Sequence, residues 1–377
     1  MEAVDVAVVG AGPAGSTLAA LLAARGLSVA LIDRDEFPRD KLCGEFLSYD
    51  GLPVAELLGL DLGDAPRIAH CRIVGRHRTY EFDFPHAARG VSRLFLDDAL
   101  HRRAVAAGAV AVTSPATAVA RNRVTTESGE IGARVVVGAW GRWGRFDQQL
   151  GRKFVRDRAH RNFGFKRHYR GGASPVIELY SFRRGYLGVS PIEGGLTNIC
   201  GLVHADRLSR LKGRWEHFVE TIRAEEPRLE SMYARHEPAQ EGFLSSDPVI
   251  FRGRSPVVDG IFMIGDSSGI VDPLTGNGMA MAMQSALLAA PFVMRALTGR
   301  AAEEAYRARH AQFFAPRIAW SRRAAYLLSR PALLDAVLRL RSREAGPFFL
   351  RHTRANVDDV RILADEWTAF RRNSTTC

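Results

Sequence analysis

Three glycines near the N-terminus have the spacing that binds the pyrophosphate of a dinucleotide. Gly10, Gly12 and Gly15 follow an apolar, β-branched run and precede an alanine-rich stretch, which predicts a strand, a tight turn and a helix. Gly10 permits the turn, Gly12 lets a phosphate approach the backbone, and Gly15 lets the helix lie close on the strand. The helix opens at Pro13, where unpaired N–H groups and the positive end of the dipole favour phosphate oxygens.

An acidic residue stands where this cradle needs one. Asp33 ends a second apolar run about 20 residues after the glycines, at the place where a carboxylate accepts hydrogen bonds from an adenosine ribose. We expect Arg34, beside it, to face the same dinucleotide.

A second motif, GDSSGIVDPLTGNGMA, distinguishes FAD from NAD. A short apolar strand ends at Gly265 and Asp266, a loop crosses to Pro273, and a long helix of small residues opens after Gly276 and Asn277. Asp266 can accept hydrogen bonds from the ribityl hydroxyls of FAD. The amides of Gly278 and Met279 can then face the flavin N1–C2=O edge, where negative charge develops on reduction.

The elements that position these motifs indicate an α/β fold. Strand patterns over 4–9, 110–112, 116–119, 124–127 and 131–137, with a helix from Leu94, predict a Rossmann-type FAD-binding domain. Antiparallel strand patterns in 71–84 and from about Asn162 predict a β-rich substrate domain. The FAD-binding domain is therefore discontinuous (1–70, 91–160 and 252–300), the substrate domain covers 71–90 and 161–251, and 301–377 form a helical C-terminal region.

The amino-acid composition limits the kinds of binding partner that we expect. The net charge is +11 and nearly all of the positive charge is arginine, but no nucleic-acid motif is present, so we expect no nucleic-acid partner. The basic C-terminal helices either lie on an anionic membrane or pack on the FAD-binding domain, and the second is favoured. The sequence does not indicate an oligomeric state.

Cysteine usage and hydropathy point to the cytoplasm. Cys43, Cys71, Cys200 and Cys377 have no metal-type spacing, so no metal site is expected, and they suggest a reducing compartment. The N-terminus has no features of a secretory leader, and no apolar run reaches the ~18 residues of a membrane span.

The two glycine motifs, with Arg93 four residues before Asp97, resemble flavoproteins of the p-hydroxybenzoate hydroxylase type. DKLCGEFLS and FGFKRHYRG resemble the geranylgeranyl reductase branch. The resemblance covers roughly residues 4 to 300 and implies non-covalent FAD beneath a β-rich substrate domain. It also implies FAD contacts from Ala14 and Arg93, together with the glycines and acids above.

Two departures from the family's motifs limit the cofactor contacts and reactions that we expect. GAWGRWGR has Trp140 where hydroxylases carry an Asp-Gly pair, which argues against their NADPH contact. GYLGVSP has Tyr186 and Gly188 where halogenases carry tryptophans, which argues against halogenation.

Five residues are candidates for catalysis or substrate binding. The resemblance places Cys43 near the flavin, where its thiol could donate a proton, with Lys41 or a helix end lowering its pKa; a small packing residue is the alternative. Glu45 orients substrate or, as the favoured alternative, forms a surface ion pair with Arg39 or Lys41. Lys166 and His168 share a strand face and act as acid and base, unless that face is simply solvated. Tyr186 lines the substrate pocket or packs.

These features predict FAD-dependent redox chemistry on an apolar small molecule, with NAD(P)H as electron donor. The sequence slightly favours a monooxygenase that hydroxylates an aromatic or polyketide-like secondary metabolite. A reductase of C=C bonds in an isoprenoid or related lipid is the alternative. A flavoprotein-fold binding module without catalysis is a third, which the intact Asp33 and Asp266 oppose.

Overall fold

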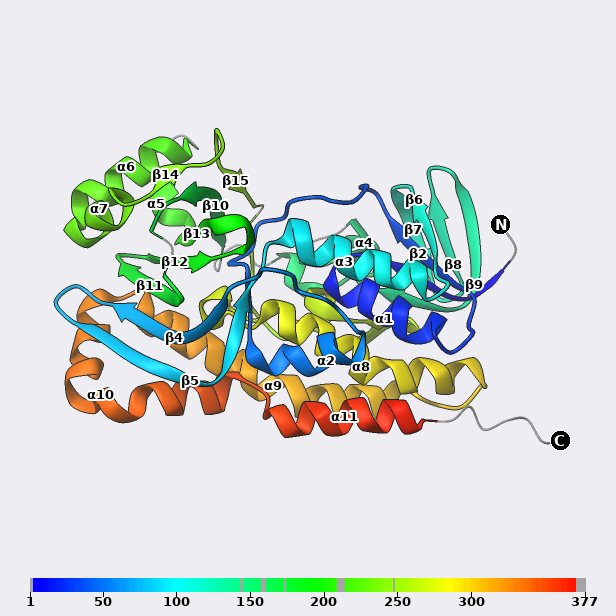
Figure 1. The fold of residues 1–377 in the computed structure, drawn as a ribbon. Coiled ribbons are helices and arrows are strands. Elements are labelled where there is room, and N and C mark those ends of the chain that lie inside the picture. Colours follow the sequence, from blue (N-terminus) through cyan, green and yellow to red (C-terminus); the bar gives the residue numbers. More distant parts are fainter. Residues whose placement is uncertain are drawn as a thin grey trace.

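Two β-sheets lie side by side, and long helices run beneath both of them (Figure 1). The computed structural model describes residues 3–142, 145–156, 161–172, 174–208, 214–246 and 248–370, the side chains of 340–343 excepted.

The first sheet is the predicted Rossmann-type sheet. Its strand order is β16-β17-β9-β1-β2-β6, with bounds Val257–Val258, Ile261–Met263, Gly129–Gly138, Val4–Val9, Val29–Asp33 and Val110–Thr113. The four strands β9, β1, β2 and β6 pair in parallel, and β17 joins β9 in parallel although it lies more than 120 residues later in the chain. A hairpin of β7 (Ala116–Ala120) and β8 (Arg123–Thr126) pairs with β9. The predicted return of the chain to this sheet is confirmed.

Helices built from small residues pack on this sheet. Every residue of α1 (Pro13–Ala23) is buried, because its alanines and glycine allow close approach of α8 (Gly278–Leu297) and α3 (Arg93–Ala106). Among the described residues, α8 alone is long and apolar enough to cross a membrane, but 72% of its apolar window is buried inside the protein. The expectation that no segment is this apolar was therefore wrong, and α8 serves here as a core helix. A cytoplasmic location stays a prediction.

The second sheet is the predicted β-rich layer. Its strand order is β14-β10-β13-β12-β11-β4-β5-β3, and β15 (Leu244–Ser245) lies beside β10. In that order, the bounds of the eight strands are Glu237–Pro238, Asn162–Arg170, Leu196–His204, Gly185–Pro191, Val176–Phe182, Arg67–Val74, Thr79–Gly90 and Phe46–Leu47. Pairing is antiparallel except between β4 and β11, which run parallel.

Strand membership differs slightly from the predicted segments. β3 and the first residues of β4 belong to the second sheet, although they fall in the segment 1–70 that we predicted to be part of the FAD-binding domain. Backbone pairing within a sheet cannot be foreseen from a two-residue strand. The division into domains itself stays a prediction.

Helices cover both faces of the second sheet. α6 (Trp215–Glu225) and α7 (Pro227–Tyr233) pack on one face, after the short α5 (Ala205–Leu208). The other face packs on α9 (Glu303–Leu328) and α10 (Pro331–Thr353). The remaining helices are α2 (Leu52–Leu57) and α11 (Val357–Ala369), which pack on α8, and α4 (Arg145–Gln149), which contacts β7.

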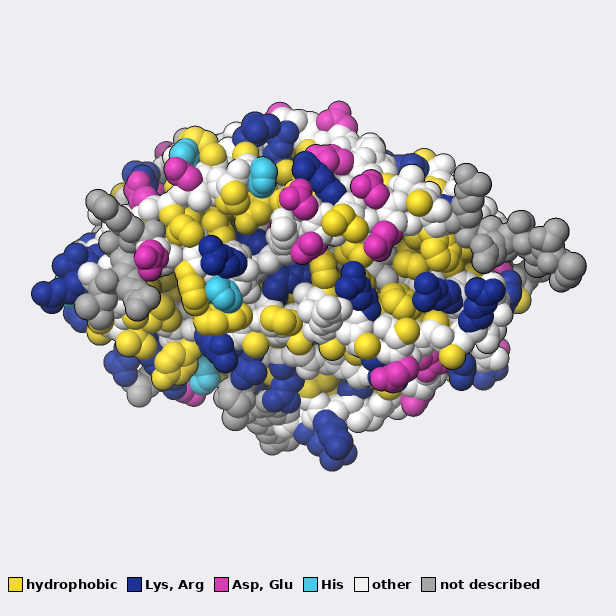
Figure 2. Space-filling view, turned by 90° about the horizontal axis from the view of Figure 1, so that it is seen from below, with side chains coloured by type: hydrophobic (Ala, Val, Ile, Leu, Met, Phe, Trp, Pro, Cys, Tyr) yellow, Lys and Arg dark blue, Asp and Glu magenta, His cyan; other side chains and the backbone are white. Residues whose placement is uncertain are grey.

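The underside formed by α9, α10 and α11 mixes apolar and basic side chains (Figure 2). Tyr326, Leu333, Phe348 and Ile362 are exposed large hydrophobic residues on these helices. The C-terminal helical region thus packs on the rest of the protein, as favoured, and also leaves a partly apolar outer face.

Candidate active site

The glycine cradle has the predicted geometry. Gly10 has a φ of +107°, and a Cβ atom there would lie 2.3 Å from the Ala139 carbonyl oxygen. A Cβ on Gly15 would lie 1.8 Å from the Gly10 carbonyl oxygen, so only glycine lets α1 approach β1. Gly12 caps α1 with no side-chain hydrogen bond, which leaves the first N–H groups of the helix available to a phosphate.

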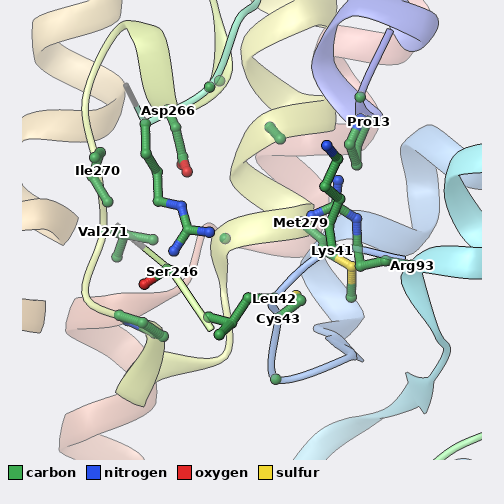
Figure 3. A pocket seen from close by; sticks show the side chains of 18 of the residues that line it. Pro13, Lys41, Leu42, Cys43, Arg93, Ser246, Asp266, Ile270, Val271 and Met279 are labelled. Atoms are coloured by element: carbon green, nitrogen blue, oxygen red, sulfur yellow. The ribbon is translucent and has the colours of Figure 1, made fainter. Parts of the chain in front are cut away.

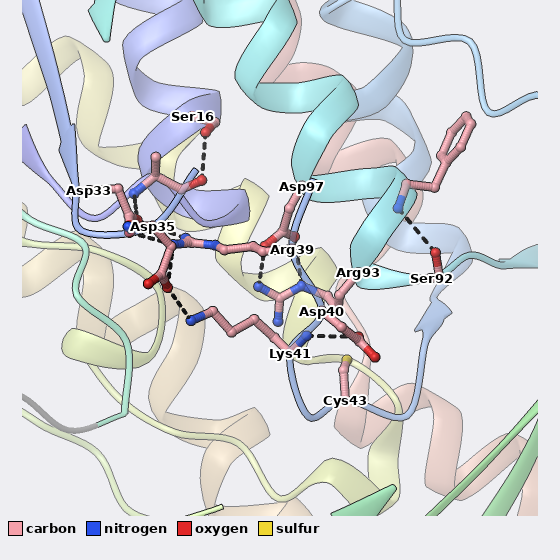
Figure 4. A network of polar contacts seen from close by, with 12 residues as sticks. Ser16, Asp33, Asp35, Arg39, Asp40, Lys41, Cys43, Ser92, Arg93 and Asp97 are labelled. Atoms are coloured by element: carbon pink, nitrogen blue, oxygen red, sulfur yellow. Dashed lines mark hydrogen bonds and ion pairs between the residues drawn. The ribbon is translucent and has the colours of Figure 1, made fainter. Parts of the chain in front are cut away.

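Asp33 is held at the end of β2 beside this cradle. Its Oδ2 accepts hydrogen bonds from the Ala11 N–H (2.7 Å) and from the Arg39 guanidinium (2.7 Å) (Figure 4). Burial alone would raise the pKa of the Asp33 carboxyl, but the hydrogen bonds and charge of Arg39 lower it. Arg34 lines the same cavity, although its side chain is 70% exposed.

Arg93 lies between the cradle and the flavin side of the site. At the N-terminus of α3, its guanidinium forms a bidentate pair with Asp97, both contacts being 2.6 Å, as Figure 4 shows. The Ser92 hydroxyl caps the helix by accepting from the Phe95 N–H. The fork of Arg93 is thereby oriented toward Gly12, 3.8 Å from the position of a Cβ there.

The second motif supplies a buried carboxylate and a helix N-terminus. Asp266 lies in a short 3-10 helix, η4 (Gly265–Ser267), anchored because the Gly265 N–H donates to the Ser285 hydroxyl (2.7 Å). Burial raises the pKa of Asp266, while Arg142, Arg254 and Arg93 oppose that rise. No side chain among the described residues hydrogen-bonds its carboxylate.

One cavity of about 690 Å³ joins both motifs. Figure 3 shows Cys43 and Arg93 on one side of it and Asp266 with Ile270 on the other. Of the predicted cofactor residues, the cavity is lined by Gly10, Gly12, Pro13, Ala14, Asp33, Arg34, Arg93, Gly265, Asp266, Pro273, Gly276, Gly278 and Met279. Asp33 and Asp266 therefore share one groove, as predicted.

Two predicted cofactor residues lie behind the wall. Gly15 is the packing residue described above. Asn277 is fully buried and its amide donates to the Thr353 carbonyl (2.7 Å), so it connects α8 to the end of α10.

The wall fits FAD. The free amides at the start of α1 suit a pyrophosphate, and Asp33 suits a ribose. Asp266 offers a carboxylate that no described side chain pairs. Apart from its chain neighbours and the backbone of its own helical turn, no heavy atom of the described residues lies within 4 Å of a Cβ built on Gly278, so a ring edge can approach the start of α8.

The loop from Asp40 to Glu45 connects this cavity to the second sheet through a buried polar network. Glu45 Oε1 accepts from the Lys166 ammonium (2.7 Å), and Oε2 lies 2.7 Å from His168 Nε2. Lys166 also contacts Asp40, and Asn198 donates to the Cys43 carbonyl (3.0 Å).

This network corrects two favoured expectations. Glu45 is not a surface residue paired with Arg39 or Lys41; it is fully buried. Lys166 and His168 do share a face, but that face is buried rather than solvated. Both lie behind Glu45 rather than on the cavity wall, so their roles as acid and base stay predictions.

Cys43 and Tyr186 lie on the wall itself. Burial raises the pKa of the Cys43 thiol, although the charge of Arg93 opposes that rise, so the thiol holds its proton at neutral pH. The expected lowering of this pKa by Lys41 was therefore wrong. The Tyr186 hydroxyl donates to Asp272 Oδ1 (2.6 Å), and burial raises the pKa of Asp272 to about 6.

Sequence reasoning missed two residues of the site. Asp272, which precedes Pro273 in the second motif, does not line the cavity itself but lies buried behind Tyr186, from whose hydroxyl it accepts a hydrogen bond. Arg354 lines the cavity from the end of α10, and no local signal separates it from the many other arginines of that helix.

This geometry defines a flavin-dependent oxidoreductase. Residues 3–61 match the family model described as FAD binding domain. The chain is 28% identical to the menaquinone reductase of Mycobacterium tuberculosis, over 97% of this chain and 91% of that protein. It is 29% identical to digeranylgeranylglycerophospholipid reductase 1 of Methanothermobacter thermautotrophicus, over 76% of each.

Solved structures share the fold. A geranylgeranyl bacteriochlorophyll reductase-like protein of Thermoplasma acidophilum matches with a TM-score of 0.76 at 22% identity, over 96% of this chain and 100% of that chain. A flavin-dependent brominase shares the fold as well. These relatives are of the p-hydroxybenzoate hydroxylase-like superfamily of FAD-dependent enzymes, so the predicted resemblance to that superfamily is confirmed.

Proposed function

We propose that this protein is a reductase that saturates a C=C bond of an apolar, isoprenoid-type molecule. The observation that carries the proposal is that the FAD cradle opens, within one cavity, into a chamber walled by apolar side chains of the second sheet, of α10 and of the loop before β16: Phe84, Ile177, Leu179, Phe349 and Phe251. Two relatives that align over most of their length have names of reductases of a prenylated quinone and of a prenyl lipid, which supports the same class.

FAD, which the glycine cradle, Asp33 and the start of α8 would hold, would supply a hydride for one carbon of the double bond once it has been reduced. The Cys43 thiol donates the matching proton to the other carbon, which receives it with the electron pair of the broken π bond. Because burial keeps this thiol protonated, it is an acid at neutral pH rather than a nucleophile. Glu45 and Tyr186, on the wall, orient the substrate, and Lys166 and His168 hold Glu45.

NAD(P)H is the proposed electron donor, and hydroxylation is the competing reaction. A monooxygenase acting on an aromatic or polyketide-like secondary metabolite would use the same FAD cradle and the same apolar chamber. The two reactions differ in product mass, so one experiment separates them.

The test is turnover of geranylgeraniol, which has no ring that dithionite can reduce, by the holoprotein, analysed by mass spectrometry. Under anaerobic conditions with dithionite, reduction predicts a product 2 Da heavier than the substrate. With O2 and NADPH or NADH, hydroxylation predicts 16 Da. A 16 Da product alone contradicts the proposal, and so does purified protein that stays colourless with added FAD.

A further inference from the structure

Two buried arginines share one buried carboxylate beside the cavity. Arg317 of α9 lies 3.7 Å from Asp50 Oδ2, and Arg354 follows α10. Asp50, in the short 3-10 helix η1 (Tyr49–Gly51), is fully buried, and the two arginines are 5% and 7% exposed. With two guanidinium groups and one carboxylate, this cluster carries one excess positive charge.

The excess charge belongs to Arg354. Its described hydrogen-bond acceptors are neutral: the Thr275 carbonyl and the Thr353 hydroxyl (3.2 Å). Its Nε is buried without a partner. Burial lowers the pKa of Arg354, which the charge of Asp50 opposes, but an arginine does not release its proton in a protein. A buried charge without a counterion is costly, so this position calls for an anion.

Arg317 shows the contrast. It has Asp50 within 4 Å, donates to the Gln284 side-chain carbonyl (2.8 Å), and lies over the rings of Phe313 and Phe314, although its Nη2, like the Arg354 Nε, is buried without a hydrogen-bond partner. It does not line the cavity, whereas Arg354 does. Arg317 is therefore held by protein groups in the interior, whereas Arg354 lies on the wall of the cavity that a ligand occupies.

Arg354 belongs to the substrate end of the cavity. Its electrostatic neighbours are Asp50, Tyr49 and Cys71, the last on β4 of the second sheet. The corresponding neighbours of Arg93 include Cys43 and Asp266, at the flavin end. The apolar residues around Arg354 are those of the chamber described above, with its guanidinium 5.9 Å from the Phe349 ring.

We propose that Arg354 binds an anionic oxygen of the substrate, such as a carboxylate, whose remaining body is apolar. The anion supplies the counterion that the cluster lacks, and the Arg354 guanidinium, which lines the cavity, offers it a charge-assisted hydrogen bond. This inference rests on the proposed function, since it specifies the head group of the molecule whose double bond is reduced.

The experiment compares farnesoate with farnesol, which share one isoprenoid chain and differ in the charge of the head group. Binding to the oxidised holoprotein is measured by equilibrium dialysis, without turnover. We expect the wild type to bind farnesoate at least about tenfold more tightly than farnesol. Arg354→Met should remove that preference and leave farnesol binding within about threefold. Arg351→Met, on the exposed face of the same helix, should change neither.

Wild-type protein that binds the two ligands equally, or does not bind farnesoate, overturns the inference without any variant. Equal loss of both ligands in Arg354→Met also overturns it. If that variant does not retain FAD, Arg354→Lys keeps the charge and should keep part of the preference. Because binding is measured without chemistry, a preserved preference with no 2 Da product would refute the proposed reaction and leave this site standing.

Discussion

The ammonium nitrogen of Lys166 lies 2.7 Å from Glu45 Oε1, and both side chains are fully buried. Glu45 has a φ of +54°, a left-handed conformation that is unfavourable for a residue with a Cβ. The contacts to Lys166 and His168 hold this conformation. The second sheet thereby fixes the loop that carries Cys43.

Breaking this pair should destabilise the protein strongly. Lys166→Met leaves the Glu45 carboxylate without its buried cation, and we expect a loss of about 3–5 kcal/mol in the free energy of unfolding. The double variant with Glu45→Gln should lose less than the sum of the single variants. Urea denaturation followed by circular dichroism measures all three. Arg102→Met, from an exposed pair, is the control and should cost less than about 1 kcal/mol. Strict additivity would contradict the coupling.

Gly15→Ala should abolish FAD binding. The added methyl group would lie 1.8 Å from the Gly10 carbonyl oxygen, so α1 must move away from the cradle. The flavin absorbance of the purified protein measures retention. Gly253→Ala, where a Cβ meets nothing within 4 Å, is the matched control and should retain FAD. Full retention by Gly15→Ala would show that the cradle tolerates displacement.

Cys43→Ser should retain FAD and lower the turnover number by about 10²–10⁴-fold, because a hydroxyl is a far weaker acid than a thiol. Stopped-flow measurement of substrate reduction by prereduced enzyme isolates this step. Cys200→Ser, at a buried thiol on the same cavity wall, is the control. Unchanged turnover in Cys43→Ser would remove the thiol from the reaction.

Asp272 should make stability depend on pH. Its pKa is about 6 in the folded protein, raised by burial, and 3.8 in the unfolded chain. The folded state therefore holds the proton more tightly, and this contribution to stability is lost as the pH rises from about 4 to 6. Asp272→Asn, which stays neutral and can still accept from Tyr186, should match wild type near pH 4. Above pH 6 it should be more stable by up to about 3 kcal/mol. Urea denaturation of the flavin-free proteins at pH 4 and 8 is the measurement, and an equal difference at both pH values would contradict it.

The underside of α9–α11 predicts contact with an anionic membrane. Its exposed apolar residues lie among arginines, so binding should need anionic lipid and weaken with salt (Figure 2). Co-sedimentation with phosphatidylglycerol vesicles at 50 and 500 mM salt, with phosphatidylcholine vesicles as control, measures it. Phe348→Glu should reduce binding. Sedimentation that ignores both salt and lipid charge would refute the contact.

The sequence specified the cofactor half of the protein well. The glycine cradle, Asp33 and Asp266 each belong to a local pattern in which a strand ends, the chain turns and a helix begins. Such a pattern can be recognised from neighbouring residues in the sequence. The structure brings the two distant acids to one cavity, as that pattern implies.

The substrate half was less predictable because its interactions are long-range. The environment of Glu45 is set by Lys166 and His168, more than 120 residues away, and no spacing rule reports such a contact. Arg354 is one arginine among many on amphipathic helices. Only the packing of α10 on the second sheet shows that it is buried on the cavity wall.

The C-terminal helices supply wall residues to the chamber but none of the predicted cofactor contacts. Phe349 and Arg354 line the cavity, whereas every predicted FAD contact comes before residue 280. Exchanging the segment after Leu297 for that of a relative should therefore produce a chimera with altered substrate preference and intact flavin affinity. Substitutions in the C-terminal helices could likewise change substrate specificity during evolution without altering the residues that hold the cofactor.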